Sequence, residues 1–142
     1  MKKLLVLILV LCVIFSVVGC TQPYEIKSLS RTATIIIRVY SDGGQTYTEH
    51  HISERESLYE VCKMFTSLEA KQIKSGKEIG SRYYIEFLNN QGVKLEGIAV
   101  ISNVKNAIWV DSNNVLYEVI SSVDISEFIK DILAKNGEIA GF

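Results

Sequence analysis

The stretch RTATIIIRVY, residues 31–40, is the first strongly patterned segment of the domain. It is rich in β-branched residues, which favour a strand, and Asp42-Gly43-Gly44 follows with residues that tolerate a positive φ. A second strand-like run occupies residues 46–52. The pattern predicts that the domain opens with a β-hairpin.

A helical pattern follows this hairpin directly. Ser53 and Glu56 stand at the spacing of a capping box, in which each side chain accepts a hydrogen bond from the amide of the other residue. Apolar side chains then recur at helical spacing at Leu58, Val61, Cys62, Phe65 and Leu68. We therefore expect a helix from residue 53 to about residue 68. Because Cys62 falls on the apolar stripe, we interpret its thiol as a core group rather than a reactive one.

Four more strands are predicted in the middle of the chain. Residues 69–81 are charged and show no clean period, which favours a mobile loop. Residues 82–88 and 93–102 flank a polar turn, and residues 107–111 and 115–120 flank another. Each pair is typical of a hairpin, so we expect four consecutive antiparallel strands.

The last patterned segment completes the fold class. Ile125, Phe128, Ile129, Ile132 and Leu133 follow the spacing of an amphipathic helix, with Asp124 as its cap and Asn136-Gly137 as its stop. The order ββαββββα predicts a two-layer α+β domain over residues 31–142. Its antiparallel sheet of about six strands would carry both helices on one face.

The first twenty residues have the layout of an export signal. Two lysines precede an apolar run over residues 4–18, and Val17-Val18-Gly19-Cys20 resembles the lipobox of bacterial lipoproteins. We expect a signal peptide over residues 1–19, cleavage between Gly19 and Cys20, and lipid attached to Cys20. An uncleaved membrane anchor is the alternative, although spanning a bilayer takes roughly 20 apolar residues. Residues 20–30 would then be the lipidated cysteine and a polar tether.

Strand alternation marks a candidate binding surface. Odd and even positions of residues 33–40 are both partly apolar, so the sheet face without helices is not expected to be purely polar. Tyr40, Tyr84 and Trp109 are our candidates for that face, where they could contact a partner. The alternative is that these strand aromatics are packing residues.

Several function classes find no support in the residues. The 15 basic and 16 acidic side chains are interspersed, so we expect no nucleic-acid partner. His50 and His51 are neighbours on a predicted strand and point to opposite faces, which disfavours a metal site. No nucleophile or cofactor motif is present, so we expect neither a catalytic residue nor a cofactor.

The pattern of residues 82–87, 108–110 and 115–119 with the closing helix resembles the small YhfM-like domains of Firmicute lipoproteins, over residues 31–135. That resemblance implies an envelope protein and supplies no catalytic residues. We expect a lipid-anchored protein on the outer face of the cell membrane, with a small binding or regulatory domain. Its partner would be a membrane-proximal protein, peptide or envelope polymer. A small envelope hydrolase or transferase and a self-associating structural protein remain alternatives.

Overall fold

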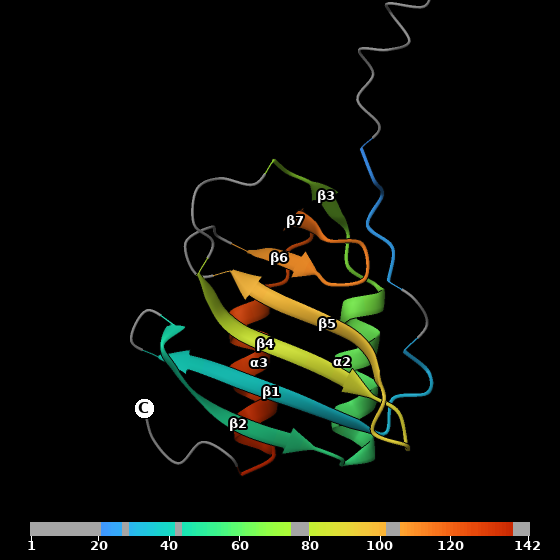
Figure 1. Cartoon of the computed structure of the whole chain (residues 1–142), viewed down its shortest axis with the longest axis vertical. Helices are drawn as coiled ribbons and strands as arrows, with labels where there is room; N and C mark the ends of the chain where they lie inside the picture. The colour runs from blue at the N-terminus through green and yellow to red at the C-terminus, as the bar shows by residue number, and fades with distance from the viewer. Residues whose placement is uncertain (1–20, 27–28, 42–43, 75–79, 102–105, 138–142) are drawn as a thin grey trace, which may run out of the picture.

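In the part of the chain that the structure describes, one antiparallel sheet is packed on two helices. The computed structural model describes residues 21–26, 29–41, 44–74, 80–101 and 106–137. Both helices, α2 (Arg55–Thr66) and α3 (Ile125–Lys135), lie behind the sheet in Figure 1. The strands are β1 (Thr34–Ser41), β2 (Thr46–Ile52), β3 (Ala70–Gln72), β4 (Ser81–Leu88), β5 (Lys94–Ile101), β6 (Ala107–Val110) and β7 (Val115–Val119). The predicted two-layer α+β class, with both helices on one face, is confirmed.

The strands lie in the order β2-β1-β4-β5-β6-β7-β3, and every neighbouring pair is antiparallel. Strands β4 to β7 are neighbours in sequence and in space, as the two predicted hairpins require. Strand β1 lies between β2 and β4, so Ile37 is opposite both His50 and Ile85. The edges of the sheet are β2 and β3.

The core fills the space between the sheet and the helices. Ile35 and Ile37 of β1 are 0% and 1% exposed, and they alternate with residues that face the other way. Phe65 of α2 meets Phe87 of β4 edge to face, with ring centroids 5.9 Å apart. The apolar sides of the two helices, which the sequence pattern predicted, are therefore the sides that pack on the sheet.

Among the described residues the sheet has seven strands rather than about six. The additional strand, β3, lies within residues 69–81, which we expected to form a mobile loop. Its three residues lack an apolar pattern, and they are extended because they pair with β7 in the register Lys71 to Glu118. Local sequence did not indicate this strand because the pairing comes from a distant segment. Residues 75–79 lie outside the described part of the chain.

The start of α2 differs from the expected capping box. Glu54, not Ser53, is the N-cap, and its carboxylate accepts hydrogen bonds from the amides of Glu56 and Ser57 at 3.0 and 2.7 Å. These amides have no partner inside the first helical turn. A carboxylate also suits the positive end of the helix dipole, and the two hydrogen bonds lower the pKa of Glu54. The N-cap of the helix is therefore one residue later than expected, at Glu54 instead of Ser53.

The ends of α3 match the expectation. Asp124 is its N-cap and accepts from the amide of Glu127 at 3.0 Å. Asn136 is the C-cap, and Gly137 has a φ of +70°, a backbone conformation that residues with a Cβ rarely adopt. The two helices also contact each other, because Lys135 forms an ion pair with Glu60 at 2.9 Å.

The segment that precedes β1 is packed against the domain. We expected residues 20–30 to form a tether, yet Leu29 is 3% exposed and belongs to the core. Tyr24 and Ile26 are partly buried against the same core. The hydroxyl of Tyr24 donates to the carbonyl oxygen of Phe65 at 2.6 Å, and its ring meets Tyr117 edge to face at 5.2 Å. Much of the expected tether is thus part of the folded body.

Cys62 is half-buried on α2 and packs against the core. Burial raises the pKa of its thiol, so the neutral form persists to higher pH than in a free cysteine. The expected signal peptide, residues 1–19, and the expected lipidation site at Cys20 lie outside the described residues.

Candidate functional site

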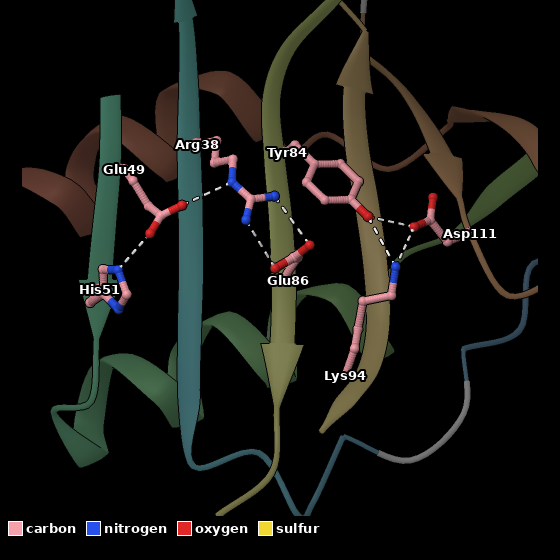
Figure 2. A network of polar contacts seen from close by, with 7 residues as sticks. All are labelled: Arg38, Glu49, His51, Tyr84, Glu86, Lys94 and Asp111. Atoms are coloured by element: carbon pink, nitrogen blue, oxygen red, sulfur yellow. Dashed lines mark hydrogen bonds and ion pairs between the residues drawn. The ribbon is translucent and has the colours of Figure 1, made fainter. Parts of the chain in front are cut away.

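The helix-free face is the surface of the sheet that neither helix covers. It is formed by the side chains of β1, β2 and β4 that alternate away from the core, together with residues of β5 and β6. Because paired residues of antiparallel strands share a face, Arg38 lies beside Glu49 on one side and Tyr84 on the other. Figure 2 shows seven polar side chains of this face. They form two groups, and hydrogen bonds or ion pairs connect the members within each group.

Arg38 is the centre of the first group (Figure 2). Its Nε donates to Glu49 at 3.0 Å, and its Nη1 and Nη2 donate to the two carboxylate oxygens of Glu86 at 3.1 and 3.3 Å. Glu49 also shares a hydrogen bond of 2.8 Å with His51. The guanidinium stacks near the rings of Tyr47 and Tyr84, at 5.6 and 5.8 Å from their centroids. One arginine thereby joins three strands.

These contacts favour the charged forms of the group. Partial burial acts to lower the pKa of Arg38, but the hydrogen bonds to Glu49 and Glu86 outweigh it, so this pKa lies above its usual value. The pKa of Glu49 is lowered, first by its hydrogen bond with His51 and then by that with Arg38. The face therefore carries a network of compensated charges rather than isolated ions.

The second group bridges β4, β5 and the end of β6 (Figure 2). The hydroxyl of Tyr84 donates to Asp111 at 2.5 Å, and Lys94 donates to Asp111 at 3.0 Å and to Tyr84 at 3.2 Å. Gly97 lies beneath this contact, and a Cβ placed on it would stand 2.5 Å from the Tyr84 hydroxyl. The absence of a side chain at Gly97 therefore creates the space in which the group assembles.

The second group holds its tyrosine as a neutral phenol. Burial raises the pKa of Tyr84, and the hydrogen bond it donates to Asp111 raises this pKa further. The ammonium of Lys94 is stabilised in turn, first by Asp111 and then by Tyr84, so its pKa lies above the usual value. This arrangement suits a fixed hydrogen-bonding platform and disfavours a tyrosinate.

The three aromatic candidates from the sequence all lie on the helix-free face, but they are not gathered at one point. Tyr40 pairs with Tyr47 near the β2 edge, with ring centroids 5.5 Å apart. Tyr84 and Trp109 pack instead on a second apolar cluster, whose buried members are Ala99, Ile101, Ala107 and Leu116. Trp109 thus has a packing role on this face, while Tyr47, at 53% exposed, offers the more accessible ring.

Sequence reasoning missed the charged members of this face. Arg38 lies two residues before Tyr40, so the same alternation that selected Tyr40 places Arg38 beside it. The partners Glu49, Glu86 and Asp111 could not be assigned in the same way, because their meeting depends on the strand order and register.

A hollow of about 510 Å³ lies on the other layer, between α3 and the ends of β1 and β4. Val39, Tyr83 and Leu133 provide its apolar wall, while Arg82 and Asp131 are charged residues of its lining. None of the seven network residues labelled in Figure 2 lines this hollow, which is therefore separate from the polar network of the helix-free face.

Two further observations concern metals and membranes. Within the described ranges, no three His, Cys, Asp or Glu side chains are grouped closely enough to hold a metal ion. In that same part of the chain, no helix has the length and apolar character needed to cross a bilayer. His50 pairs with Ile37 and His51 with Ile36, so the two histidines point to opposite faces of β2.

Comparison of the chain with protein-family models, with curated proteins and with solved structures found no match. The resemblance to YhfM-like domains therefore stays a prediction.

Proposed function

We propose that this chain is a lipoprotein anchored by lipid on Cys20 at the outer face of the cell membrane, and that its domain binds a protein or peptide partner through the helix-free face. The sequence of residues 17–20 supports the anchor. One residue bearing two acyl chains gives durable membrane attachment, because each buried methylene contributes about 0.8 kcal/mol.

The arrangement around Arg38 is the observation that carries the proposed binding role. Its guanidinium donates to two carboxylates and lies near two tyrosine rings, so the side chain is held in one orientation before any partner arrives. Arginine and tyrosine are the residue types that contribute most to protein interfaces. Because the Arg38 charge is already compensated, this face suits a mixed polar and aromatic peptide surface better than a single small anion.

Photo-crosslinking in cells tests the partner-binding face. A benzophenone amino acid would replace Tyr47, which is 53% exposed on the helix-free face, and in a matched strain Tyr59, which is 64% exposed on α2 behind the sheet. We expect Tyr47 to yield a discrete crosslinked product of higher mass and Tyr59 to yield none. Equal products from both positions, or none from Tyr47, would contradict the proposal.

The same experiment separates heterologous binding from self-association. A product with twice the mass of the chain, carrying only peptides of this protein, would replace the proposed partner with a second copy. A product containing peptides of another envelope protein supports the proposal as stated, and mass spectrometry of the excised band distinguishes the two.

The Cys20→Ala variant tests the proposed lipid anchor separately. We expect the parent chain to remain in the membrane fraction at high salt and to lose its first 19 residues. The variant should keep its signal and lose the lipid, as seen by mass and by metabolic labelling with a fatty acid. A labelled Cys20→Ala protein would rule out Cys20 as the lipid acceptor.

A further inference from the structure

The N-terminal segment is fixed to the domain at its very start. The amide of Gln22 donates to the side-chain oxygen of Gln72 in β3 at 2.6 Å. The next residue, Pro23, accepts a hydrogen bond from the hydroxyl of Tyr117 in β7 at 3.2 Å. Tyr24 then packs on Tyr117 and donates to Phe65. Three consecutive residues are thus attached to the β7 and β3 end of the sheet.

Tyr24 is partly buried against the core, so its contacts are more than a surface association. Burial raises the pKa of Tyr24, and the nearby carboxylate of Glu96, which is 2% exposed, raises it further. Figure 1 shows residues 21–26, in blue, beside β7 and β3 at one end of the sheet. The chain therefore exits at one end of the strand order, beside an edge strand.

Very little chain separates this exit from the expected lipid. Only Thr21 lies between Cys20 and Gln22. Consecutive Cα atoms are about 3.8 Å apart, so the Cα of a lipid-bearing Cys20 stays within roughly 8 Å of the Cα of Gln22, whatever conformation the chain adopts. A lipid on Cys20 would thus enter the bilayer right beside β3.

We propose that the docked N-terminal segment holds the β3 end of the sheet against the lipid headgroups and directs the β2 edge away from the membrane. The inference rests on the proposed lipidation of Cys20. Seven strands spaced about 4.8 Å apart place the β2 edge roughly 29 Å from β3. Tyr47 and its neighbours on β2 then face the envelope, while Lys71 and Lys74 lie at the membrane surface.

Paramagnetic broadening of amide signals measures this orientation directly. The full lipidated chain would be placed in nanodiscs that contain a small fraction of lipid with a gadolinium chelate on its headgroup. We expect the amide signals of Lys71, Gln72 and Ile73 to lose most of their intensity. Signals of Thr46, Tyr47 and Thr48 should keep theirs, because they lie at the opposite edge of the sheet.

A spacer variant provides the matched control. Ten Gly and Ser residues inserted between Thr21 and Gln22 leave every docking contact in place and lengthen the connection by roughly 17 Å in root-mean-square reach. This protein should stay bound to the nanodisc, while the selective loss of signal at β3 disappears. The spacer therefore separates attachment from orientation.

Each other outcome has a distinct meaning. Equal broadening of β2 and β3, or stronger broadening of β2, in a protein that remains nanodisc-bound would overturn the orientation and leave the lipid anchor intact. A parent chain that carries no lipid and does not associate with nanodiscs would overturn the proposed function and the orientation together.

Discussion

The hydroxyl of Tyr84 on β4 donates a hydrogen bond of 2.5 Å to Asp111 at the end of β6. Strand β5 lies between these two strands, so the contact passes over its backbone at Gly97. Any side chain at Gly97 would occupy the space that the hydroxyl and the carboxylate need. The contact is therefore a property of three strands in the observed register rather than of any one segment.

Gly97→Ala should destabilise the domain by about 1–3 kcal/mol, because the added methyl group would overlap Tyr84 and Asp111 and force them apart. Urea denaturation followed by circular dichroism measures the loss. In a Tyr84→Phe/Asp111→Ala background the obstructing atoms are absent, and the same substitution should cost much less. An equal cost in both backgrounds would indicate that the backbone of β5, not the contact above it, excludes alanine.

The network around Glu49 should make stability depend on pH. The folded pKa of Glu49 lies below its ordinary value of 4.5, so its contribution is fully present above about pH 4.5 and is lost as the pH falls through the lower folded pKa. The difference in unfolding free energy between the parent and Glu49→Gln should therefore shrink on acidification from pH 6 to pH 3. A difference that is constant over this range would show that Glu49 gains nothing from His51 and Arg38.

Tyr24 should contribute to stability although it precedes the first strand. Tyr24→Phe keeps the ring against Tyr117 and loses the hydrogen bond to Phe65, for an expected cost of about 1 kcal/mol. Tyr24→Ala also loses the ring contact, and we expect on the order of 2 kcal/mol, below the 3–5 typical of a fully buried aromatic. Thermal or urea unfolding of both variants checks this order. No effect from either would mean that the segment does not pack on the domain.

Cys62 should react slowly in the folded protein. Burial raises the pKa of its thiol and so reduces the thiolate that attacks a disulfide reagent. In a Cys12→Ala/Cys20→Ala chain, in which Cys62 is the one remaining thiol, reaction with Ellman's reagent should be slow in buffer and fast after unfolding in urea. Raising the pH should accelerate the native reaction over a higher pH range than for a free cysteine. A native rate equal to the unfolded rate would place the thiol at the surface.

The fold class followed from sequence because the elements with strong periodicity are also the elements that form the core. The stripe of α3, for example, becomes the set Ile125, Ile129, Ile132 and Leu133, each no more than 1% exposed. Strand β3 was not predicted, because it lacks such a periodic pattern. Its three residues carry little pattern of their own, and they are extended by pairing with β7, which lies more than forty positions later in the chain.

The candidate site was predictable only in part. Strand alternation placed Tyr40 and Tyr84 on the helix-free face. The hydrogen bonds of Arg38 to Glu49 and Glu86 could not be predicted in this way, because they depend on the position of β1 between β2 and β4. The sequence does contain a signal for the docking of residues 21–26. Tyr24, Ile26 and Leu29 are apolar groups within an otherwise polar segment that we expected to form a tether.

The contact between Pro23 and Tyr117 joins residues 94 positions apart. A ribosome makes the chain from the N-terminus, so Tyr24 emerges long before the surface on which it docks. Strand β3 likewise cannot pair until β7 has been made. This corner of the domain therefore cannot close until β7 is present, and contacts between segments so far apart in the chain are expected to form slowly.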